Sequence, residues 1–228
     1  MSAPPRTTRL AGLTPPLVVA AALELLDREG LEAFSMRALA RELGVQPGAL
    51  YVHVVDRESL LADVAGLLLS DVRLPPGSKP WDEWLRDFAR SYRAALHAHA
   101  GASSVVSGQL VSNGPQDFPV VEGVLAALHR GGFSGRSLVD AYDVFLGWLV
   151  GFVGVELAPA PIASTGWADR RRDDLRDIDP AAYPVMAAHR KWLEGAFAVR
   201  WRSGADAPMD RAFAASLDVV ITGLAARL

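Results

Sequence analysis

The sequence predicts an all-α protein with a small N-terminal three-helix head and a larger C-terminal helical domain. Apolar residues recur at the three- and four-residue spacing of helix faces along most of the chain, and we find no strand-like alternation. Residues that cap or break helices separate these segments. The strongest break is the stretch LPPGSKP over residues 74–80, because its three prolines cannot continue a helix.

Composition limits the classes of function. Half of the 228 residues are apolar, and the 23 basic and 26 acidic residues give a net charge of −3. Acidic and basic residues nearly balance within residues 1–60 as well, so any affinity for nucleic acid depends on where charges lie and on dimerisation. The chain has no cysteine, which excludes disulfides and fits a reducing cytoplasm.

Membrane targeting is not indicated. The first residues are polar and proline-rich, without the apolar core of a signal peptide. The longest uncharged apolar run, Val144–Val155, is twelve residues long, too short to cross a bilayer, and we expect a buried helix there.

The head should begin after a polar arm at residues 1–12, which we expect to be a disordered terminus; the alternative is an arm that contacts nucleic acid. Thr14 and Pro15 are suited to start a first helix, which Gly30 ends. Asp56 is a good N-cap for a helix that reaches about Val72, so the head domain covers residues 13–73.

Two short helices between Ser35 and Asp56 carry the main functional signal. Apolar residues mark one face of the first: Met36, Leu39, Ala40 and Leu43. Ser35 can cap it, Gly44 suits its left-handed end, and Pro47 suits the first turn of the second, which we call the reading helix. Leu50 and Val54 can pack the reading helix against the first of these two helices. The pattern is that of a helix-turn-helix, the alternative being an ordinary pair of core helices.

Residues Leu13–Ala65 closely resemble, without a gap, the N-terminal domain of the TetR family of bacterial repressors. The likeness is greatest to the tetracycline-repressor branch, which has the same Leu-Tyr-x-His-Val core as residues 50–54. The resemblance implies that double-stranded DNA is bound by Ser35, Arg37, Gln46, Pro47, Gly48, Ala49, Tyr51, His53 and Arg57. Tyr51 and His53 are expected mainly at phosphates, Arg37 at a guanine or a phosphate. Arg57, where the family commonly has lysine, is expected at a phosphate.

The second domain, residues 81–228, follows the 74–80 linker. Helices are expected at about 81–100, 117–130, 134–158, 183–202 and 207–227, with at most a short helix at 105–110. Ser134 should cap the third of these. Residues 159–182 are expected to form a solvated loop, because acids interleave with the basic triplet Arg170–Arg172.

Catalytic and metal-binding constellations are not found in the sequence. His97 and His99 are two apart on a predicted helix and should face different ways, so they do not form a pair of metal ligands. The glycines of residues 131–135 lack the preceding strand and following lysine of a phosphate loop. We therefore expect no enzyme, no cofactor and no metal site.

The second domain resembles the tetracycline-repressor body, from Gly77 to Gly101 and at the helix start near Phe133. The resemblance places these residues at effector-pocket positions: Phe88, Tyr92, Val106, Val121, Val124, Tyr142 and Leu146. Val106 stands where the tetracycline repressor has a histidine for the drug's magnesium. The expected effector is therefore a small, largely apolar molecule and not a metal-chelated tetracycline.

A homodimer is expected through a four-helix bundle of helices 134–158 and 207–227 from each subunit. Gly147 and Gly151 permit close helix approach, and the last helix carries the apolar stripe Phe213, Leu217, Val220 and Leu224. Together these features predict a cytoplasmic repressor that binds a palindromic operator as a homodimer and is released by its effector. The alternative is a cytosolic helical small-molecule-binding protein with a non-functional head.

Overall fold

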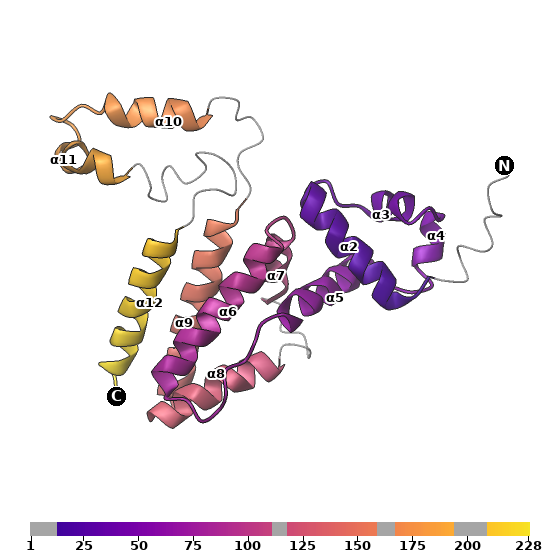
Figure 1. Ribbon diagram of the computed structural model, residues 1–228, viewed down its shortest axis with the longest axis horizontal. Helices are drawn as coiled ribbons and strands as arrows, with labels where there is room; N and C mark the ends of the chain where they lie inside the picture. The colour runs from indigo at the N-terminus through magenta and orange to yellow at the C-terminus, as the bar shows by residue number, and fades with distance from the viewer. Residues whose placement is uncertain (1–12, 111–117, 159–166, 194–208) are drawn as a thin grey trace.

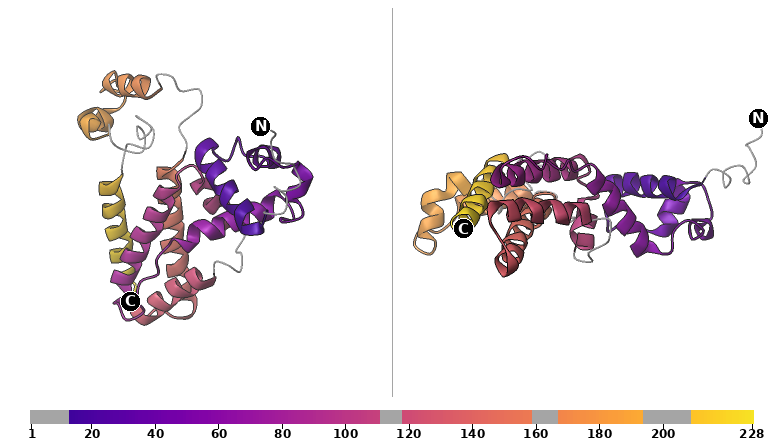
Figure 2. Two further views of the ribbon diagram at one scale, coloured as in Figure 1. Left: turned by 45° about the vertical axis from the view of Figure 1, so that its right-hand side comes forward. Right: turned by 90° about the horizontal axis from the view of Figure 1, so that it is seen from below.

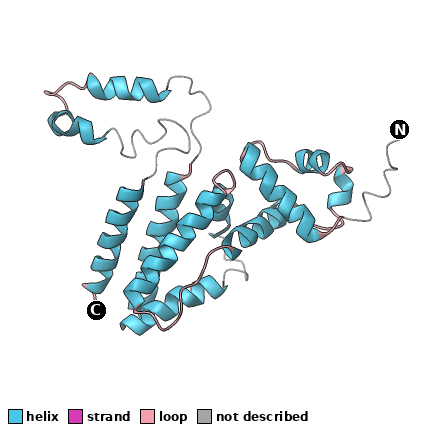
Figure 3. Cartoon of the chain, viewed as in Figure 1, coloured by secondary structure: helices cyan, strands magenta, loops and turns pink. Residues whose placement is uncertain are grey.

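The computed structural model describes residues 13–110, 118–158, 167–193 and 209–228, and all regular structure in these ranges is helical (Figures 1 and 3). The all-α fold class is therefore confirmed. The predicted arm at residues 1–12 lies outside the described residues. Figure 2 shows the N-terminal head extending to one side of the longer helices of the body.

The head consists of α2 (Pro15–Glu29), α3 (Met36–Glu42), α4 (Pro47–Leu50) and α5 (Arg57–Ser70). Its predicted caps are confirmed. The Thr14 hydroxyl accepts from the Leu17 amide at 3.4 Å, and the Asp56 carboxylate accepts from the Ser59 amide at 2.7 Å. One leucine from each helix, Leu25, Leu39, Leu50 and Leu60, is almost completely buried, so the four helices share one core.

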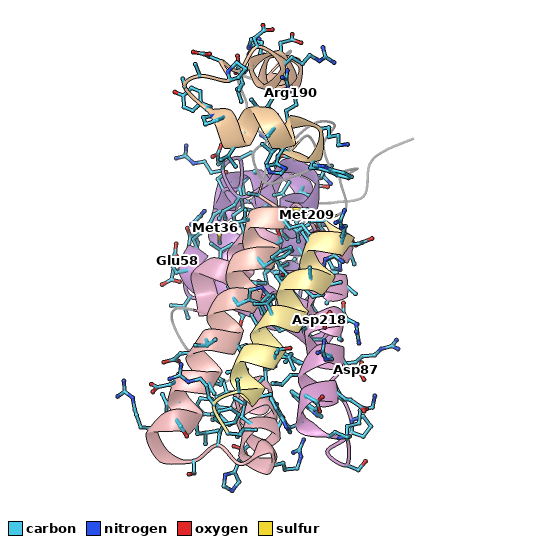
Figure 4. All side chains as sticks on the ribbon, turned by 90° about the vertical axis from the view of Figure 1, so that its left-hand side faces the viewer. Met36, Glu58, Asp87, Arg190, Met209 and Asp218 are labelled. Carbon is cyan, nitrogen blue, oxygen red and sulfur yellow. The ribbon has the colours of Figure 1, made fainter. Side chains whose placement is uncertain are left out.

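The body contains α6 (Trp81–Ala98), α7 (Ser103–Leu110), α8 (Phe118–Gly131), α9 (Gly135–Glu156) and α12 (Asp210–Ala225). Phe88 of α6 and Phe145 of α9 lie at its centre, with ring centroids 6.3 Å apart and no exposed surface. Helices α9 and α12 run side by side along one face (Figure 4).

The expected loop at 159–182 is wrong in part, because α10 (Trp167–Arg176) occupies its middle. Interleaved charges favour a helix when opposite signs are three or four residues apart, as in the Asp173–Arg176 pair at 3.2 Å. Helix α11 (Pro184–Leu193) lies within the helix predicted from residue 183, and residues 194–202 lie outside the described part. The pair α10–α11 stands at one end of the body (Figure 1).

Residues 144–155 are helical, as predicted, but the expected burial holds on one side of the helix only. Helix α9 is long and apolar enough to span a membrane by length and composition alone, and only 28% of its most apolar window is buried. One side packs on the body through Phe145, Leu149 and Val153, whereas Val144 and Val155 are 54% and 47% exposed. The apolar residues of this run therefore lie on two sides of α9, one packed against the body and one exposed.

The head joins the body at two places: α5 packs against α7 and α6, and the C-terminal turn of α2 meets the turn between α6 and α7. Asp27 accepts a hydrogen bond from the Ala102 amide at 3.2 Å, and its other carboxylate oxygen lies 2.5 Å from His99 Nδ1. A Cβ on Gly101 would lie 2.7 Å from both the Cα and the carbonyl carbon of Asp27, so only glycine permits this approach.

A buried ion cluster closes the opposite side of α6. Arg93 donates two hydrogen bonds to Glu156 at 2.9 and 2.6 Å and also pairs with Asp210 at 2.7 Å. His97 Nε2 lies 3.2 Å from the Glu156 carboxylate, whose side chain is 2% exposed. Burial alone would raise the pKa of Glu156, but the bonds with Arg93 and His97 outweigh it and lower this pKa below its ordinary value of 4.5. The cluster ties α6 to the end of α9 and the start of α12.

Glu156→Gln should lower the free energy of unfolding at pH 7 by roughly 3 kcal/mol, because it leaves a buried guanidinium with one partner fewer. Since the folded-state pKa of Glu156 is lowered, its contribution is complete above the unfolded pKa and is lost as pH falls through the folded value. Urea titrations of both proteins from pH 7 down to pH 3 should therefore show the difference shrinking below pH 4.5.

The matched control is Asp218→Asn, which breaks the Arg86–Asp218 pair on the surface, where Asp218 is 67% exposed. That variant should unfold within about 1 kcal/mol of the wild type. An equal loss in the two variants would contradict the special role of the buried cluster.

Candidate functional site

The reading helix is anchored by its apolar side. Gly44 adopts a left-handed conformation with φ 68°, and the Val45 amide then donates to the Ala40 carbonyl at 2.9 Å, which closes the sharp turn after α3. Leu50 has no exposed surface and Val54 has 6%, so both dock on the head core as predicted. The remainder of the reading helix faces away from that core.

The side chains predicted to bind DNA lie mostly on the outside of the head. Arg37 is exposed and makes no hydrogen bond or ion pair within the described residues, and Tyr51 is 53% exposed. Gln46 and Gly48 are also exposed, whereas Pro47, Ala49 and His53 are half-buried. Ser35 has a structural task, because its hydroxyl accepts from the Ala38 amide at 3.2 Å and caps α3.

Arg57 is positioned by two neighbours at the start of α5. Its guanidinium lies 5.8 Å from the centre of the Phe34 ring and donates to Glu58 at 3.0 Å. Phe34 is 5% exposed, so the ring is a fixed support. Sequence reasoning missed this role of Phe34; the available signal was an aromatic residue directly before the N-cap Ser35.

Four of the seven predicted effector residues are buried in the body: Phe88, Tyr92, Val106 and Val124. Val121, Tyr142 and Leu146 are half-buried. The Tyr92 hydroxyl is buried without a hydrogen-bond partner among the described residues, and burial raises its pKa above the ordinary value of 10.0. Trp148 Nε1, which the sequence did not single out, is likewise buried and has no partner in the part of the chain that the structure describes. Unpaired polar atoms in an apolar interior are suited to a ligand that supplies the partner.

Two surface clefts flank α6, and none of the predicted effector residues lines either. One of about 600 Å³ lies along the linker and is lined by residues including Arg73, Pro75 and Ser91. The other, of about 420 Å³, lies beside the ion cluster and is lined by residues including Arg93, His97 and Phe213.

The predicted dimer stripe on the last helix needs correction. Phe213, Leu217 and Leu224 are 2–4% exposed, because they pack within the same chain, and Val220 is half-buried. Phe213, for example, stacks on Trp148 with ring centroids 5.6 Å apart. The stripe was correctly located along the sequence but faces inwards.

A different face of α9 and α12 remains free in the single chain. Gly147 and Gly151 are exposed, and a Cβ at either would meet nothing within 4 Å. On α12, Val219 is 72% exposed, and Ala215 and Gly223 are exposed beside it. With Val144 and Val155 these residues define a small-residue, apolar surface, which we call the α9–α12 face.

Family models match both parts of the chain. Residues 18–64 match bacterial regulatory proteins of the tetR family, and residues 74–228 match the tetracyclin repressor-like C-terminal domain. The chain belongs to the TetR family. It is therefore a ligand-responsive transcription regulator with a DNA-binding helix-turn-helix head, and the resemblance to the tetracycline-repressor branch is confirmed.

Individual TetR-family relatives agree with this assignment. An HTH-type transcriptional regulator from Saccharopolyspora erythraea is 31% identical over 78% of this chain and 75% of its own length. The structure of the TetR family protein ActR from Streptomyces coelicolor in complex with actinorhodin superposes with a TM-score of 0.72 and 27% identity, covering 94% of this chain and 96% of ActR. BioQ bound to its double-stranded DNA operator gives a TM-score of 0.63 and 25% identity, covering 94% and 99%.

Tyr92→Phe should leave the free energy of unfolding unchanged or raise it by up to about 1 kcal/mol, because it removes a buried hydroxyl that has no partner. Urea titration of the ligand-free protein measures this. Tyr183→Phe is the control, since that ring is 57% exposed and its hydroxyl reaches water. A loss of more than 1 kcal/mol at Tyr92 would mean that its hydroxyl is already satisfied.

Arg37→Ala and Arg57→Ala should weaken DNA binding in different ways. Losing an Arg37–guanine pair should cost about 1–3 kcal/mol and relax the preference at one base pair. Losing an Arg57–phosphate contact should weaken binding to all sequences alike and reduce the slope of log affinity against log salt by about 1. Fluorescence anisotropy on matched duplexes at several salt concentrations separates the two.

Arg130→Ala, an exposed arginine of α8 in the body, serves as the control and should leave DNA affinity unchanged. Unchanged affinity in the Arg37 and Arg57 variants as well would mean that the DNA-binding surface has been assigned to the wrong side of the head.

Proposed function

We propose that the protein is a cytoplasmic repressor that binds a palindromic operator as a homodimer and leaves it when a small, largely apolar effector enters the body. It has no catalytic role in this proposal. The observation that carries it is the arrangement of the helix-turn-helix. Leu50 and Val54 fix the reading helix to the core, while Arg37 and Tyr51 face solvent, Arg37 without a partner among the described residues.

Dimerisation is supported by the α9–α12 face. A two-fold interface brings the same surface of each subunit together, so an exposed stripe of glycine, alanine and valine meets its own copy. Glycines at positions 147 and 151 allow the helix backbones to approach closely. Two heads at a fixed spacing bind as a bivalent unit, which offsets the weak electrostatic attraction of a nearly neutral head.

The effector is proposed to bind among the buried residues of α6 and α9. Phe88 and Phe145 offer apolar contacts, and the unpaired Tyr92 hydroxyl and Trp148 Nε1 offer one polar contact each. The actinorhodin complex of ActR supports a small organic molecule as the class of ligand. Val106, fully buried and aliphatic, has no atom that could bind a metal ion, so a metal-chelated effector is not proposed.

Release follows from the position of α6. This helix carries Phe88 and Tyr92, and the turn at its end carries His99 and Gly101, which contact Asp27 of the head. An effector that favours a different position of α6 therefore also favours a different position of the head. Thermodynamically, the effector must bind the conformation that does not fit the operator more tightly than the one that does.

The proposal is tested by selecting operator sequences from random duplex DNA with the full-length protein. We expect a palindromic site whose half-site centres are roughly one helical turn, 34–36 Å, apart, or somewhat further if the DNA is deformed. Selection of no sequence would contradict the repressor and favour a small-molecule-binding protein whose head has lost its function. Selection of an asymmetric, single half-site would contradict binding of the operator as a symmetric homodimer.

Ala215→Arg together with Val219→Arg should give monomers that lose most operator affinity. Both side chains are exposed in the single chain, so folding should be preserved, and in a two-fold interface the new charges would face their own copies. Arginine is chosen because added positive charge would by itself strengthen DNA binding. Sedimentation at micromolar concentration and anisotropy with the selected operator measure the two effects.

The control for these arginines is Val185→Arg on α11, a residue that is 71% exposed and lies outside the α9–α12 face. It should remain dimeric and bind the operator. A wild-type protein that sediments as a monomer, or a double variant that stays dimeric, would refute the assigned interface.

A further inference from the structure

Val52 lies on the outer side of the reading helix. It is 80% exposed, although valine is an apolar residue that usually packs. Tyr51 beside it is also exposed, and Leu50 and Val54 take up the contacts with the core. Val55, just beyond the reading helix, is 83% exposed as well. Single exposed apolar side chains are common, so it is the position of Val52 on the reading helix that makes it available to a partner outside the chain.

The helical geometry places Val52 opposite the anchored side. The helical turn continues beyond Leu50, because the amides of His53 and Val54 both donate to the Leu50 carbonyl, at 2.9 and 3.1 Å. At 3.6 residues per turn, Val52 lies about 200° around the helix from Leu50. Val52 thus points away from the core of the head.

Gly48 leaves the space next to Val52 open. It lies one turn earlier on the same side, and a Cβ there would meet nothing within 4 Å. With no side chain at Gly48 and only a methyl group at Ala49, a flat surface can approach the helix until it meets Val52.

The chemistry of the segment limits what this surface can recognise. Residues 46–55 contain no charged side chain; only Gln46, Tyr51 and His53 carry polar groups on their side chains. Valine cannot distinguish hydrogen-bond donors from acceptors on a base edge. The one apolar group that DNA exposes in the major groove is the thymine 5-methyl group.

We propose that Val52 determines operator specificity by packing against the 5-methyl group of one thymine in each half-site. The inference rests on the proposed function and goes beyond it, since it names the side chain and the DNA group that select the base. Arg37 would select by hydrogen bonding, whereas Val52 selects by apolar contact, so the two side chains discriminate at different base pairs.

The test is a double-mutant cycle between the protein and single methyl groups of the DNA. Each thymine of the selected operator is replaced in turn by deoxyuridine, which removes the methyl group and retains base pairing. Wild-type affinity should fall roughly fourfold for one such position in one half-site, and on the order of tenfold when both half-sites are changed, as expected for burying a methyl group.

Val52→Ala should bind the thymine and deoxyuridine operators equally at that position and keep the wild-type response at every other thymine. Val185→Ala, another exposed valine, should behave as the wild type throughout. Unchanged thermal unfolding of Val52→Ala would show that the head is intact, as expected for an exposed side chain.

The proposal is overturned if no deoxyuridine position weakens wild-type binding, or if Val52→Ala keeps the full sensitivity to every methyl group. Either result would leave the repressor function standing, because the protein would still bind its selected operator. Failure to select any operator would instead overturn the proposed function itself.

Discussion

Asp27 is held at the end of α2 by the turn that joins α6 to α7, and this contact connects the two functional halves of the molecule. His99 and the Ala102 amide bind its carboxylate, and Gly101 lies against its backbone without a side chain between them. No linker residue intervenes here, so a shift of the α6–α7 turn acts directly on the first helix of the head. Helix α5 of the head also packs against α7 and α6, so the position of the head is set by both contacts, and the reading helix follows because it shares a core with α2 and α3.

The same helix α6 is held from its other side by a second polar contact. Arg93 and His97 bind Glu156, which lies at the end of α9, and Arg93 also lies over the Phe213 ring at 4.7 Å. The C-terminal part of α6 and the turn after it thus carry, in order, the buried Tyr92 hydroxyl, the ion cluster and the contact with the head. A ligand bound at Tyr92 would lie close to the ion cluster and to the contact with Asp27. Ligand binding in the body could therefore be coupled to the position of the head through α6.

Features that depend on neighbouring residues, such as helix caps and tight turns, could be predicted from the sequence. Features that depend on packing between distant segments could not. Caps at Thr14, Ser35 and Asp56, and the left-handed Gly44, follow from local chemistry, and each is confirmed. The apolar stripe of Phe213 and Leu217 was also visible, but periodicity cannot show which neighbour a stripe faces, and both residues turned inwards. Helix α10 is rich in charged residues and has no apolar stripe, so apolar periodicity could not predict it.

Glu156 and Trp148 show a second limit of sequence reasoning. A glutamate at the end of an apolar run resembles any exposed terminal charge, and only the fold brings Arg93 and His97 to it from residues about 60 positions away. Likewise, a tryptophan on an apolar helix resembles core, and its unpaired Nε1 is apparent only from the surrounding side chains. Partners distant in the sequence therefore determine the chemistry of the body.

The acidic net charge of the chain is compatible with DNA binding because several acids of the head are engaged locally. Glu42 pairs with Arg28 at 3.0 Å, and Glu58 pairs with Arg57. Asp56 is occupied in capping α5, and its bonds with Ser59 lower its pKa. Arg37, by contrast, has no acidic partner among the described residues, and the segment from Gln46 to Val55 carries no acid at all. The surface proposed to face the groove therefore carries no acid between Gln46 and Val55 that would repel phosphates, although the head as a whole is nearly neutral.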